Sequence, residues 1–375
     1  MLSVKQRSRQ LVSFTVIGAM LALVLGCTPS NPQSTFDALG PIAEMQLFVF
    51  NVIFWIGAVV FVLVEGALVY IIVKFRRRLG DGDPVQTHGN TRMEIAWTIA
   101  PVIILIIAAV PTIQGIFLMA NSPLTPAQGG LELDAIGHQW WFEFRYPNPN
   151  DPNQQIVFAN ELHMPVGEPV NINLRSVDVI HSFWIPKMGG KVDMVPNNDN
   201  GMWLQANSQG EFYGQCAEFC GVSHANMRFK VIVESRDSFN AWLQAQAVPA
   251  PDPIDALALQ GKELFRSAGC TGCHATNSVM NLAEGGRRLP GRVGPNLSHV
   301  ASRLYLAGLL PNKDEGSLTV NDALLQQNLK TWLSDPDDVK PGNIMTRDAK
   351  VYSDPDSKLE EREIDALVAY LLTLN

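Results

Sequence analysis

Two long apolar runs near the amino terminus constrain this chain more than any other feature. They cover residues 47–73 and 95–118, and each exceeds the roughly 20 residues that a helix needs to cross a bilayer. Charged residues make up 17% of the chain, against about 25% in soluble globular domains. The sequence therefore predicts a multidomain membrane protein in which residues 45–120 form a two-helix transmembrane hairpin.

Basic residues predict the orientation of this hairpin. The connecting loop, residues 74–94, is rich in Lys and Arg, whereas residues 28–46 and 119–144 contain neither. Basic loops remain in the cytoplasm. We therefore expect a multi-pass protein of the bacterial plasma membrane, with everything after residue 118 on the outer, periplasmic face. The basic residues are Lys74, Arg76, Arg77, Arg78 and Arg92.

The amino terminus resembles a targeting segment. Three basic side chains precede an apolar run at residues 11–25, which is typical of a secretory signal peptide. The run ends in Leu-Gly before Cys27, and this ending resembles the cleavage box of bacterial lipoproteins. In that interpretation residues 1–26 are removed, Cys27 is acylated, and residues 27–44 form an N-terminal segment. The alternative is an uncleaved anchor with an incidental cysteine.

Four soft metal donors lie within a short stretch. Cys216, Cys220, His224 and Met227 offer two thiolates, an imidazole and a thioether, a set that suits copper better than magnesium or calcium. His181, which closes an apolar run upstream, is the candidate for a second imidazole. A blue-copper site needs one thiolate, so a second thiolate would allow two copper ions to be bridged. A disulfide between the two cysteines and a zinc site also remain open, although zinc would not use Met227.

Together with Glu218, these residues resemble the complete CuA ligand set of cytochrome c oxidase subunit II. The resemblance implies that Cys216 and Cys220 bridge two copper ions and that each histidine binds one of them. Met227 would then be an axial ligand, and Glu218 would bind through its backbone carbonyl. The resemblance also implies that the Glu218 carboxylate contributes to a magnesium or manganese ion shared with subunit I.

The segment that surrounds this motif has a β pattern. Between residues 131 and 234, short apolar runs alternate with Pro, Gly and Asn, which is typical of a sandwich or barrel. The resemblance implies a cupredoxin-like β-sandwich at residues 121–247, with the ligands on loops at one end. The clearest predicted strands are 131–136, 170–174, 202–206 and 229–233.

Trp140 lies in an aromatic stretch, residues 137–144. The stretch resembles the patch through which members of the family receive electrons from cytochrome c. The alternative is that Trp140 is an ordinary core or interface aromatic. Asp178 and Asp193 match acidic positions of the family near the metal and the subunit I interface; without the resemblance they would be solvated loop charges.

Two carboxylates accompany the apolar runs. Glu65 lies within the first run, where an ionisable group usually faces protein or water, and either a subunit contact or hydration would explain it. Glu94 opens the second run, and Thr91-Arg92-Met93-Glu94 indicates a capping box. Residues 88–101 also resemble the family's second-span signature, in which this glutamate marks the cytoplasmic mouth of a proton pathway into subunit I.

A second cofactor motif follows a proline-rich linker at residues 248–258. Cys270, Cys273 and His274 form the C-x-x-C-H signature of c-type haem attachment. Two thiols would bind the macrocycle covalently, and His274 would be the proximal iron ligand. The alternative is a chance match or a thiol redox pair.

The other axial ligand is predicted to be a methionine. Met345 ends a Lys-Pro-Gly-Asn-Ile-Met segment that resembles the methionine loop of class I cytochromes c. Met280 is too close to His274 in sequence to reach the opposite haem face. Residues 259–375 are therefore expected to form an all-α class I cytochrome c domain.

The resemblance covers nearly the whole chain and implies subunit II of a haem–copper cytochrome c oxidase with a fused cytochrome c domain. Such a subunit would pass electrons from cytochrome c, another respiratory complex or its own haem to CuA. Subunit I, with subunit III beside it, would reduce oxygen to water and pump protons. The alternatives are a CuA-containing nitric oxide reductase subunit and an envelope copper-delivery protein. The net charge of −8 disfavours nucleic acid as a partner.

Overall fold

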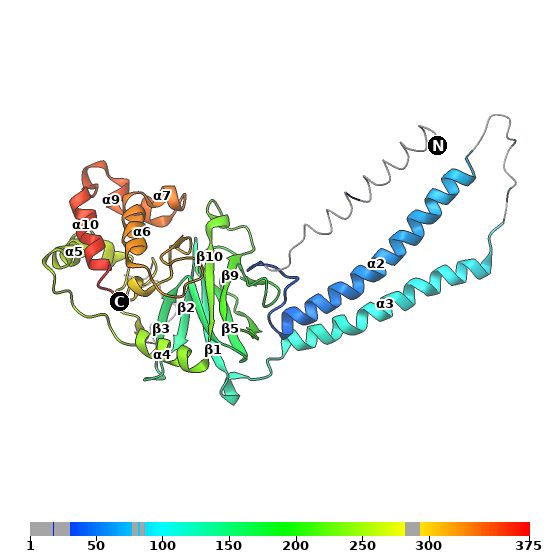
Figure 1. Ribbon diagram of the computed structural model, residues 1–375, viewed down its shortest axis with the longest axis horizontal. Helices are drawn as coiled ribbons and strands as arrows, with labels where there is room; N and C mark the ends of the chain where they lie inside the picture. The colour runs from blue at the N-terminus through cyan, green and yellow to red at the C-terminus, as the bar shows by residue number, and fades with distance from the viewer. Residues whose placement is uncertain (1–17, 19–30, 77–81, 83–85, 87, 282–292) are drawn as a thin grey trace, which may run out of the picture.

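Three parts follow one another along the long axis of the molecule: a helical hairpin, a β-sandwich and a helical carboxy-terminal domain (Figure 1). The computed structural model describes residues 18, 31–76, 82, 86, 88–281 and 293–375. The expected order of hairpin, cupredoxin-like sandwich and helical domain is confirmed. The predicted signal peptide (apart from Gly18) and Cys27 lie outside the described residues, as does much of the loop between the apolar runs.

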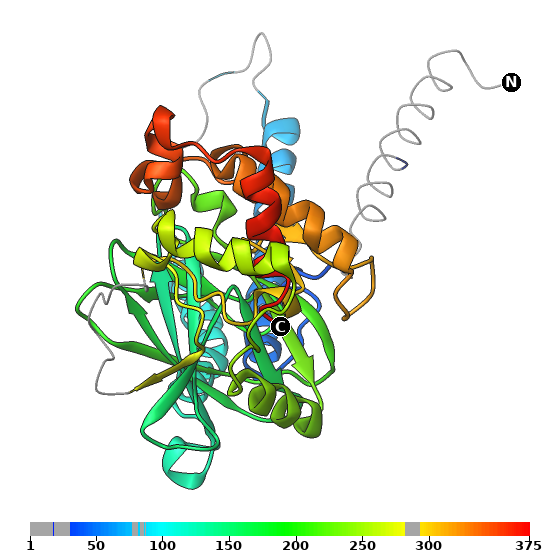
Figure 2. The same ribbon diagram turned by 90° about the vertical axis from the view of Figure 1, so that its left-hand side faces the viewer.

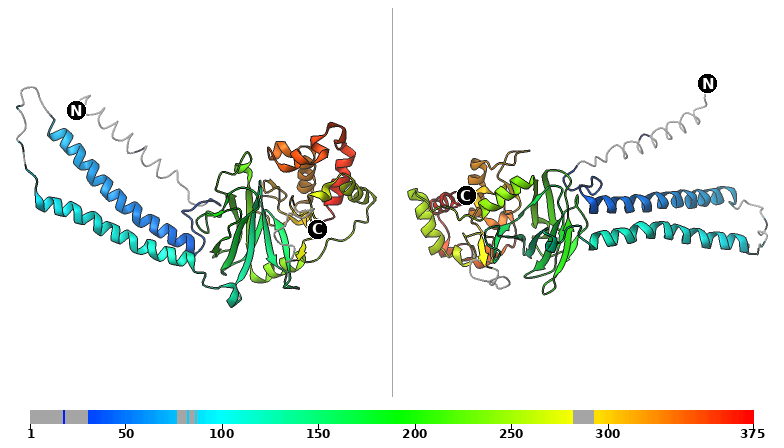
Figure 3. Two further views of the ribbon diagram at one scale, coloured as in Figure 1. Left: turned by 180° about the vertical axis from the view of Figure 1, so that it is seen from behind. Right: turned by 90° about the horizontal axis from the view of Figure 1, so that it is seen from below.

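The two apolar runs form the long helices α2 (Pro41–Lys74) and α3 (Thr91–Ala120). Both are long and apolar enough to cross a membrane, and they lie side by side (Figure 3). The capping-box prediction is wrong about the N-cap. Asn90 caps α3, because its side-chain oxygen accepts from the backbone of Arg92 at 3.1 Å and of Met93 at 3.3 Å.

The outer ends of the hairpin are attached to the sandwich. The indole of Trp203 donates a hydrogen bond to the backbone carbonyl of Leu118, near the end of α3, at 3.0 Å. Ile42, in the first turn of α2, is buried within the sandwich core. These contacts place the β-sandwich directly above the hairpin, at the face that the basic-loop pattern predicts to be periplasmic.

Two sheets form the sandwich. One has the strand order β11-β3-β2-β1-β5-β8, and the other has the order β4-β10-β9-β6-β7. All four predicted strand regions are strands, although the third starts and ends two residues earlier than expected. The bounds are β1 Leu131–His138, β2 Trp141–Pro147, β3 Gln154–Ala159, β4 Glu161–Pro165, β5 Val170–Ser176, β6 His181–Trp184, β7 Val192–Met194, β8 Asn200–Leu204, β9 Gly210–Cys216, β10 Arg228–Glu234 and β11 Val279–Asn281.

Aromatic rings fill the space between the two sheets. Phe142 of β2 contacts Phe229 of β10, with ring centroids 4.7 Å apart, and Phe229 stacks on Phe183 of β6 at 4.9 Å. All three side chains are fully buried. Close packing of this kind fixes the strands relative to each other, and β6, β9 and β10 are the strands that flank the metal-ligand candidates.

The carboxy-terminal domain packs against one side of the sandwich (Figure 2). Its core lies where α5, α6 and α10 meet. Short strands accompany the expected helices, and one of them, β11, joins the sandwich sheet next to β3. Helix α4 (Arg236–Gln246) precedes the linker. The other helices are α5 Ala256–Ser267, α6 Asp322–Ser334, α7 Pro336–Val339, α8 Ile344–Asp348, α9 Lys350–Ser353 and α10 Glu361–Leu371, and a ladder joins β12 Tyr305–Leu306 to β13 Leu310–Pro311.

Candidate metal centre

Strand pairing brings the separated donors to one end of the sandwich. His181 is the first residue of β6, and Cys216 is the last residue of β9. These two strands pair, with Phe183 opposite Cys216. The loop from β9 to β10 carries the remaining donors and closes where the backbone nitrogen of Cys216 donates to the carbonyl of Met227 at 2.9 Å.

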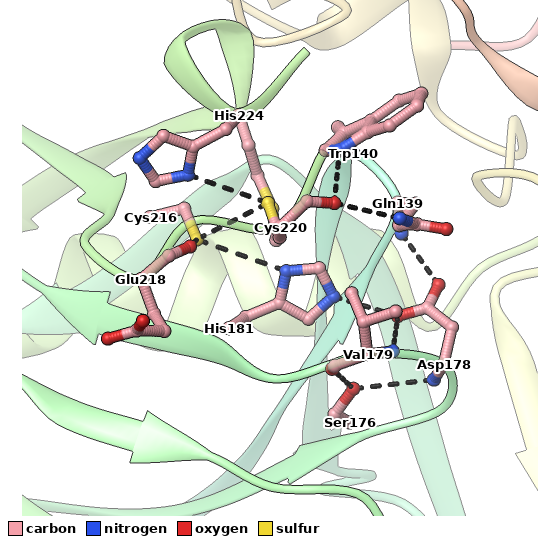
Figure 4. Close-up of polar contacts among 11 residues, drawn as sticks. Gln139, Trp140, Ser176, Asp178, Val179, His181, Cys216, Glu218, Cys220 and His224 are labelled. Atoms are coloured by element: carbon pink, nitrogen blue, oxygen red, sulfur yellow. Dashed lines mark hydrogen bonds and ion pairs between the residues drawn. The ribbon is translucent and has the colours of Figure 1, made fainter. Parts of the chain in front are cut away.

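The candidate donor atoms converge on a small buried volume (Figure 4). His181, Cys216 and Cys220 offer donor atoms that all lie within 4.8 Å of one another. The two Sγ atoms are 3.8 Å apart. The Cys220 Sγ is 3.5 Å from Nδ1 of His224 and 3.8 Å from Sδ of Met227. All of these residues except His224 are buried.

This geometry discriminates between the alternatives left open by the sequence. A disulfide requires an S–S distance of about 2 Å, so the two thiols are free in this structure. Zinc would have no use for the thioether of Met227, which nevertheless lies among the donors. Two thiols, two imidazoles and a thioether form a soft set that fits copper.

Asp178 fixes the orientation of His181. Its carboxylate contacts Nε2 of the imidazole at 2.8 Å and accepts from the backbone of Gln139 at 2.8 Å and Val179 at 2.7 Å. Burial alone would raise the pKa of Asp178, but these hydrogen bonds outweigh it and lower the pKa. A charged Asp178 therefore holds a proton on Nε2 and leaves Nδ1 directed at the thiols.

The backbone of Gly137 lies directly against the imidazole of His181. A Cβ atom on Gly137 would lie 2.6 Å from Cδ2 of His181, so only glycine fits here without moving the imidazole.

The two thiols share one proton more readily than they hold two. The hydrogen bond from Cys220 lowers the pKa of Cys216, and contact with His181 acts in the same direction. The same pairing raises the pKa of Cys220. One thiolate is thus favoured by the protein alone, and a bound cation is needed to favour the second.

The second cofactor motif lies at the end of α5. Cys270 starts a short 3-10 turn, and the backbone nitrogen of His274 donates to its carbonyl at 2.9 Å. Nδ1 of His274 lies 2.7 Å from the carbonyl of Pro295, which leaves Nε2 available to an iron ion. Cys273 and Cys270 are both partly exposed, as thiols that must react with a macrocycle require.

The two methionine candidates lie in different surroundings. Met280 is buried in β11 and pairs with Gln155 of β3 in the sandwich sheet. Met345 lies in α8 and packs at the edge of the carboxy-terminal core, as does Cys270. Residues 282–292, between the haem motif and α8, lie outside the described part of the chain.

Comparisons with known proteins identify the families to which the parts of this chain are similar. The families described as Cytochrome C oxidase subunit II, periplasmic domain and transmembrane domain match residues 131–235 and 29–114. The family Cytochrome c matches residues 258–375. Cytochrome c oxidase subunit 2 of Alkalihalophilus pseudofirmus is 36% identical over 96% of both chains. The chain belongs to the cytochrome c oxidase subunit II family.

Other similar proteins carry the same name. Cytochrome c oxidase subunit 2 of Bacillus sp. strain PS3 is also 36% identical, over 96% of both chains. A solved periplasmic domain of subunit II of cytochrome oxidase from Bradyrhizobium japonicum is 31% identical and covers 31% of this chain and 92% of that one, with a TM-score of 0.29.

Family membership makes this chain a membrane-bound subunit of the haem–copper oxidase. It implies copper in residues 131–235, hereafter the copper domain, and haem c in residues 258–375, hereafter the haem domain. The copper domain matches the periplasmic part of the family, and α2 and α3 lie in the transmembrane match.

The backbone and the side chain of Glu218 lie in different surroundings. Its backbone carbonyl lies 3.2 Å from the Cys216 Sγ, within the donor cluster. Its carboxylate points away (Figure 4) and lies 3.6 Å from the ammonium of Lys191. The side chain is 44% exposed, so a partner or an ion can reach it from outside the copper domain.

Trp140 contacts the copper-ligand loop directly. Its indole Nε1 donates to the carbonyl of Cys220 at 3.0 Å, and the residue is 8% exposed. The side chain of Gln139 donates to the same carbonyl at 2.7 Å. The sequence analysis missed Gln139, for which adjacency to Trp140 is the only available signal.

The remaining carboxylates lie away from the donor cluster. Glu94 is in the first turn of α3 and Glu65 is within α2, and both side chains are exposed. Asp193 is exposed in β7, in contrast to Asp178 beside the imidazole.

Proposed function

We propose that this subunit receives electrons at the haem of its carboxy-terminal domain, passes them to a binuclear copper centre and delivers them to subunit I. Subunit I would reduce oxygen to water and couple this reaction to proton pumping. When bound, the haem and the copper pair supply reversible one-electron chemistry. The observation that carries the proposal is the convergence of the donors of His181, Cys216 and Cys220 within 4.8 Å.

The residues of the copper domain would hold two copper ions with little rearrangement. Cys216 and Cys220 would bridge them, and His181 and His224 would each bind one ion. Met227 and the backbone carbonyl of Glu218 would complete the set. Because the donors are attached to packed strands and the site is largely buried, the ligands would keep similar positions in both oxidation states, which favours rapid electron transfer.

The residues of the haem domain would hold the second redox group. Cys270 and Cys273 would form thioethers, and His274 would bind the iron through the nitrogen that Pro295 leaves free. Met345 is the proposed axial ligand on the opposite side. The position of Met280 in a strand paired with the copper domain supports this choice.

Trp140 is proposed to carry electrons towards the copper pair. Its indole is bonded to the backbone of the ligand Cys220, so it offers a short covalent and hydrogen-bonded route to a copper-bound sulfur. The electrons would come to this subunit from a cytochrome c or from another respiratory complex.

An ion site, the location of the two domains and a further subunit are proposed from the family resemblance. The exposed carboxylate of Glu218 would help bind a magnesium or manganese ion at the boundary with subunit I. The haem and copper domains would both lie on the periplasmic face of a bacterial plasma membrane, and subunit III would complete the complex.

Glu94 would mark the cytoplasmic mouth of a proton pathway into subunit I. A Glu94→Gln variant in the assembled oxidase should slow turnover and proton pumping while leaving the copper and haem spectra unchanged. Retention of full turnover and pumping would leave Glu94 with its structural role at the start of α3.

The experiment that tests the electron-transfer function uses the full chain, purified in detergent and loaded with copper and haem. Metal analysis should give two copper ions per chain. Paramagnetic resonance should give a mixed-valence dicopper signal, together with a low-spin haem that becomes high-spin in Met345→Ala. A single copper ion per correctly loaded chain would exclude the binuclear centre.

A further inference from the structure

One segment of the haem domain lies directly against Trp140. This segment, residues 340–345, is hereafter the methionine loop because it ends at Met345. Lys340 is 4% exposed, and its ammonium donates to the backbone carbonyl of Trp140 at 3.0 Å and to that of Ala307 at 2.7 Å. The first of these bonds joins residues that are 200 positions apart in the sequence.

The methionine loop also contacts the copper-ligand loop itself. Ser223, which precedes the ligand His224, is buried and donates its hydroxyl to the carbonyl of Pro341 at 2.6 Å. The backbone of Gly342 has a φ of 72°, and a Cβ there would lie 3.6 Å from Cη2 of Trp140 and 3.5 Å from Cβ of Val222. The chain therefore passes at van der Waals distance from the indole.

Hydrogen bonds inside the methionine loop connect Lys340 to Met345. The side chain of Asn343 donates to the carbonyl of Lys340 at 2.8 Å. Its oxygen accepts from the backbone of Thr346 at 3.0 Å and caps α8, the helix that contains Met345. The position of Met345 is thus set relative to Trp140 through a continuous set of short contacts.

We propose that Lys340 is a positioning residue for electron transfer. Its ammonium bonds to Ala307 within the haem domain and to Trp140 of the copper domain, and so holds the methionine loop in a fixed position against Trp140. The inference rests on the proposed function, in which one electron leaves the reduced haem and is gained by the oxidised copper pair. Ser223 supports the same contact from the copper side.

The energetic cost of burying Lys340 argues that this contact does more than tether the domain. Burial lowers the pKa of Lys340 to about 7, and an ammonium taken out of water is costly unless its hydrogen bonds are satisfied. The linker at residues 248–258 already keeps the two domains at high effective concentration. The linker does not set the position of the methionine loop, whereas the buried hydrogen bond from Lys340 to the Trp140 carbonyl does.

A second group of contacts would keep the domains together if Lys340 were replaced. Glu211 of the copper domain accepts a hydrogen bond from the hydroxyl of Tyr305 at 2.6 Å and pairs with Lys313 at 2.6 Å. The ammonium of Lys230 lies 4.0 Å from the centroid of the Tyr305 ring. In a Lys340 variant the haem domain should therefore stay docked, while the methionine loop is held less firmly against Trp140.

The test compares Lys340→Leu with Lys330→Leu in the full chain loaded with copper and haem. Lys330 is a matched control, because it pairs with Glu361 and Asp365 inside the haem domain. A ruthenium photosensitiser with a sacrificial electron donor reduces the haem after a light pulse, and the transfer of the electron to copper is followed by absorbance. Pulsed paramagnetic resonance on the oxidised protein gives the distribution of haem–copper distances.

We expect Lys340→Leu to slow haem-to-copper transfer severalfold, because the electronic coupling between the two centres falls steeply as the methionine loop moves away from Trp140. The haem and copper spectra should be unchanged and the distance distribution should broaden, while Lys330→Leu should match the native chain. Ser223→Ala should give a smaller slowing in the same direction. If Lys340→Leu fails to incorporate haem, the transfer rate in Ser223→Ala becomes the test of the positioning role.

Two results would overturn the inference, and they differ. If the native chain transfers electrons from haem to copper and both Lys340→Leu and Ser223→Ala do so at the native rate, the positioning role is wrong and the proposed function stands. If the loaded native chain shows no transfer between the two centres, the proposed function fails and the positioning role fails with it.

Discussion

The copper site favours one thiolate among its two cysteines, whereas the haem site favours none. In the copper domain, the contact with Cys220 lowers the pKa of Cys216, so the protein itself favours a thiolate. In the haem domain, burial raises the pKa of Cys270 to about 11 and raises that of Cys273. A metal ligand must be a thiolate, whereas a thioether carries no charge once it has formed. The copper domain therefore prepares one of its two sulfurs for a cation, and the haem domain keeps both of its sulfurs uncharged, as they would be in thioethers.

The two sites also differ in how much of the binding geometry the chain builds alone. Two of the copper donors, His181 and Cys216, lie at the ends of packed strands, and the loop from β9 to β10 brings Cys220 beside them without a bound ion. The haem ligands lie on a 3-10 turn and on the five-residue helix α8, which are short elements. Short helices are marginal by themselves. We infer that the copper domain needs its metal for function, whereas the haem domain needs its haem for structure as well.

The largest test of this difference removes the haem. A Cys270→Ser, Cys273→Ser double variant should bind no covalent haem, and amide exchange in α5, α8 and α10 should become much faster because the domain loses the group that His274 and Met345 would also hold. The copper signal should remain. Native exchange protection in the haem-free domain would contradict the comparison.

Removal of copper should have a smaller structural effect. Cys220→Ser should abolish the dicopper signal and electron transfer to subunit I, but the β-sandwich should lose only about 1–3 kcal/mol, the cost of a poorly paired buried hydroxyl. Amide exchange in β9 and β10 measures this. Met227→Leu is the control, since it keeps both thiols and should retain copper with an altered spectrum.

How far the sequence predicts each site follows from the separation of the contacting residues. The loop from Cys216 to Met227 is local, so its spacing alone indicates a metal site. His181 required the expectation of a β-sandwich, since it reaches the loop only through pairing of β6 with β9. The contact of Lys340 with Trp140 joins two domains, and no periodicity or spacing predicts it.

At two positions, Asn90 and Asp178, the structure differs from what the sequence pattern alone suggests. Asn90 precedes Thr91 and is at least as good an N-cap, so α3 starts one residue earlier than the capping-box pattern suggests. Without the family resemblance, the sequence predicts a solvated loop charge at Asp178. Its contact with Nε2 of His181 forms only in the folded chain, so no local pattern indicates it.

Acid should destabilise the copper domain through Glu143, a carboxylate unrelated to either cofactor. Burial would raise its pKa, but a hydrogen bond from His138 and the charge of Arg145 outweigh this and lower the pKa to about 2. A folded-state pKa below the unfolded value near 4.3 gives stability that is present above about pH 4.3 and is lost as the pH falls towards 2, up to about 3 kcal/mol.

Glu143→Gln should remove that part of the pH dependence. Amide exchange of β1 and β2 in the metal-free chain, corrected for the intrinsic effect of pH, measures it. Glu132→Gln, at an exposed position of β1, should keep the native slope. An unchanged slope in Glu143→Gln would show that other groups cause the acid sensitivity of the copper domain.

The finest test concerns the preorganisation of the copper site itself. Asp178→Asn keeps the shape of the side chain but removes the charge that holds the proton on Nε2 of His181. Because such outer partners usually contribute about 10- to 100-fold to metal affinity, competition with a copper chelator should show a loss of that size. Asp193→Asn, at an exposed position of β7, should bind copper normally. If Asp178→Asn also bound copper with native affinity, the convergence of the donors would depend on strand packing alone, and the contrast with the haem site would become greater.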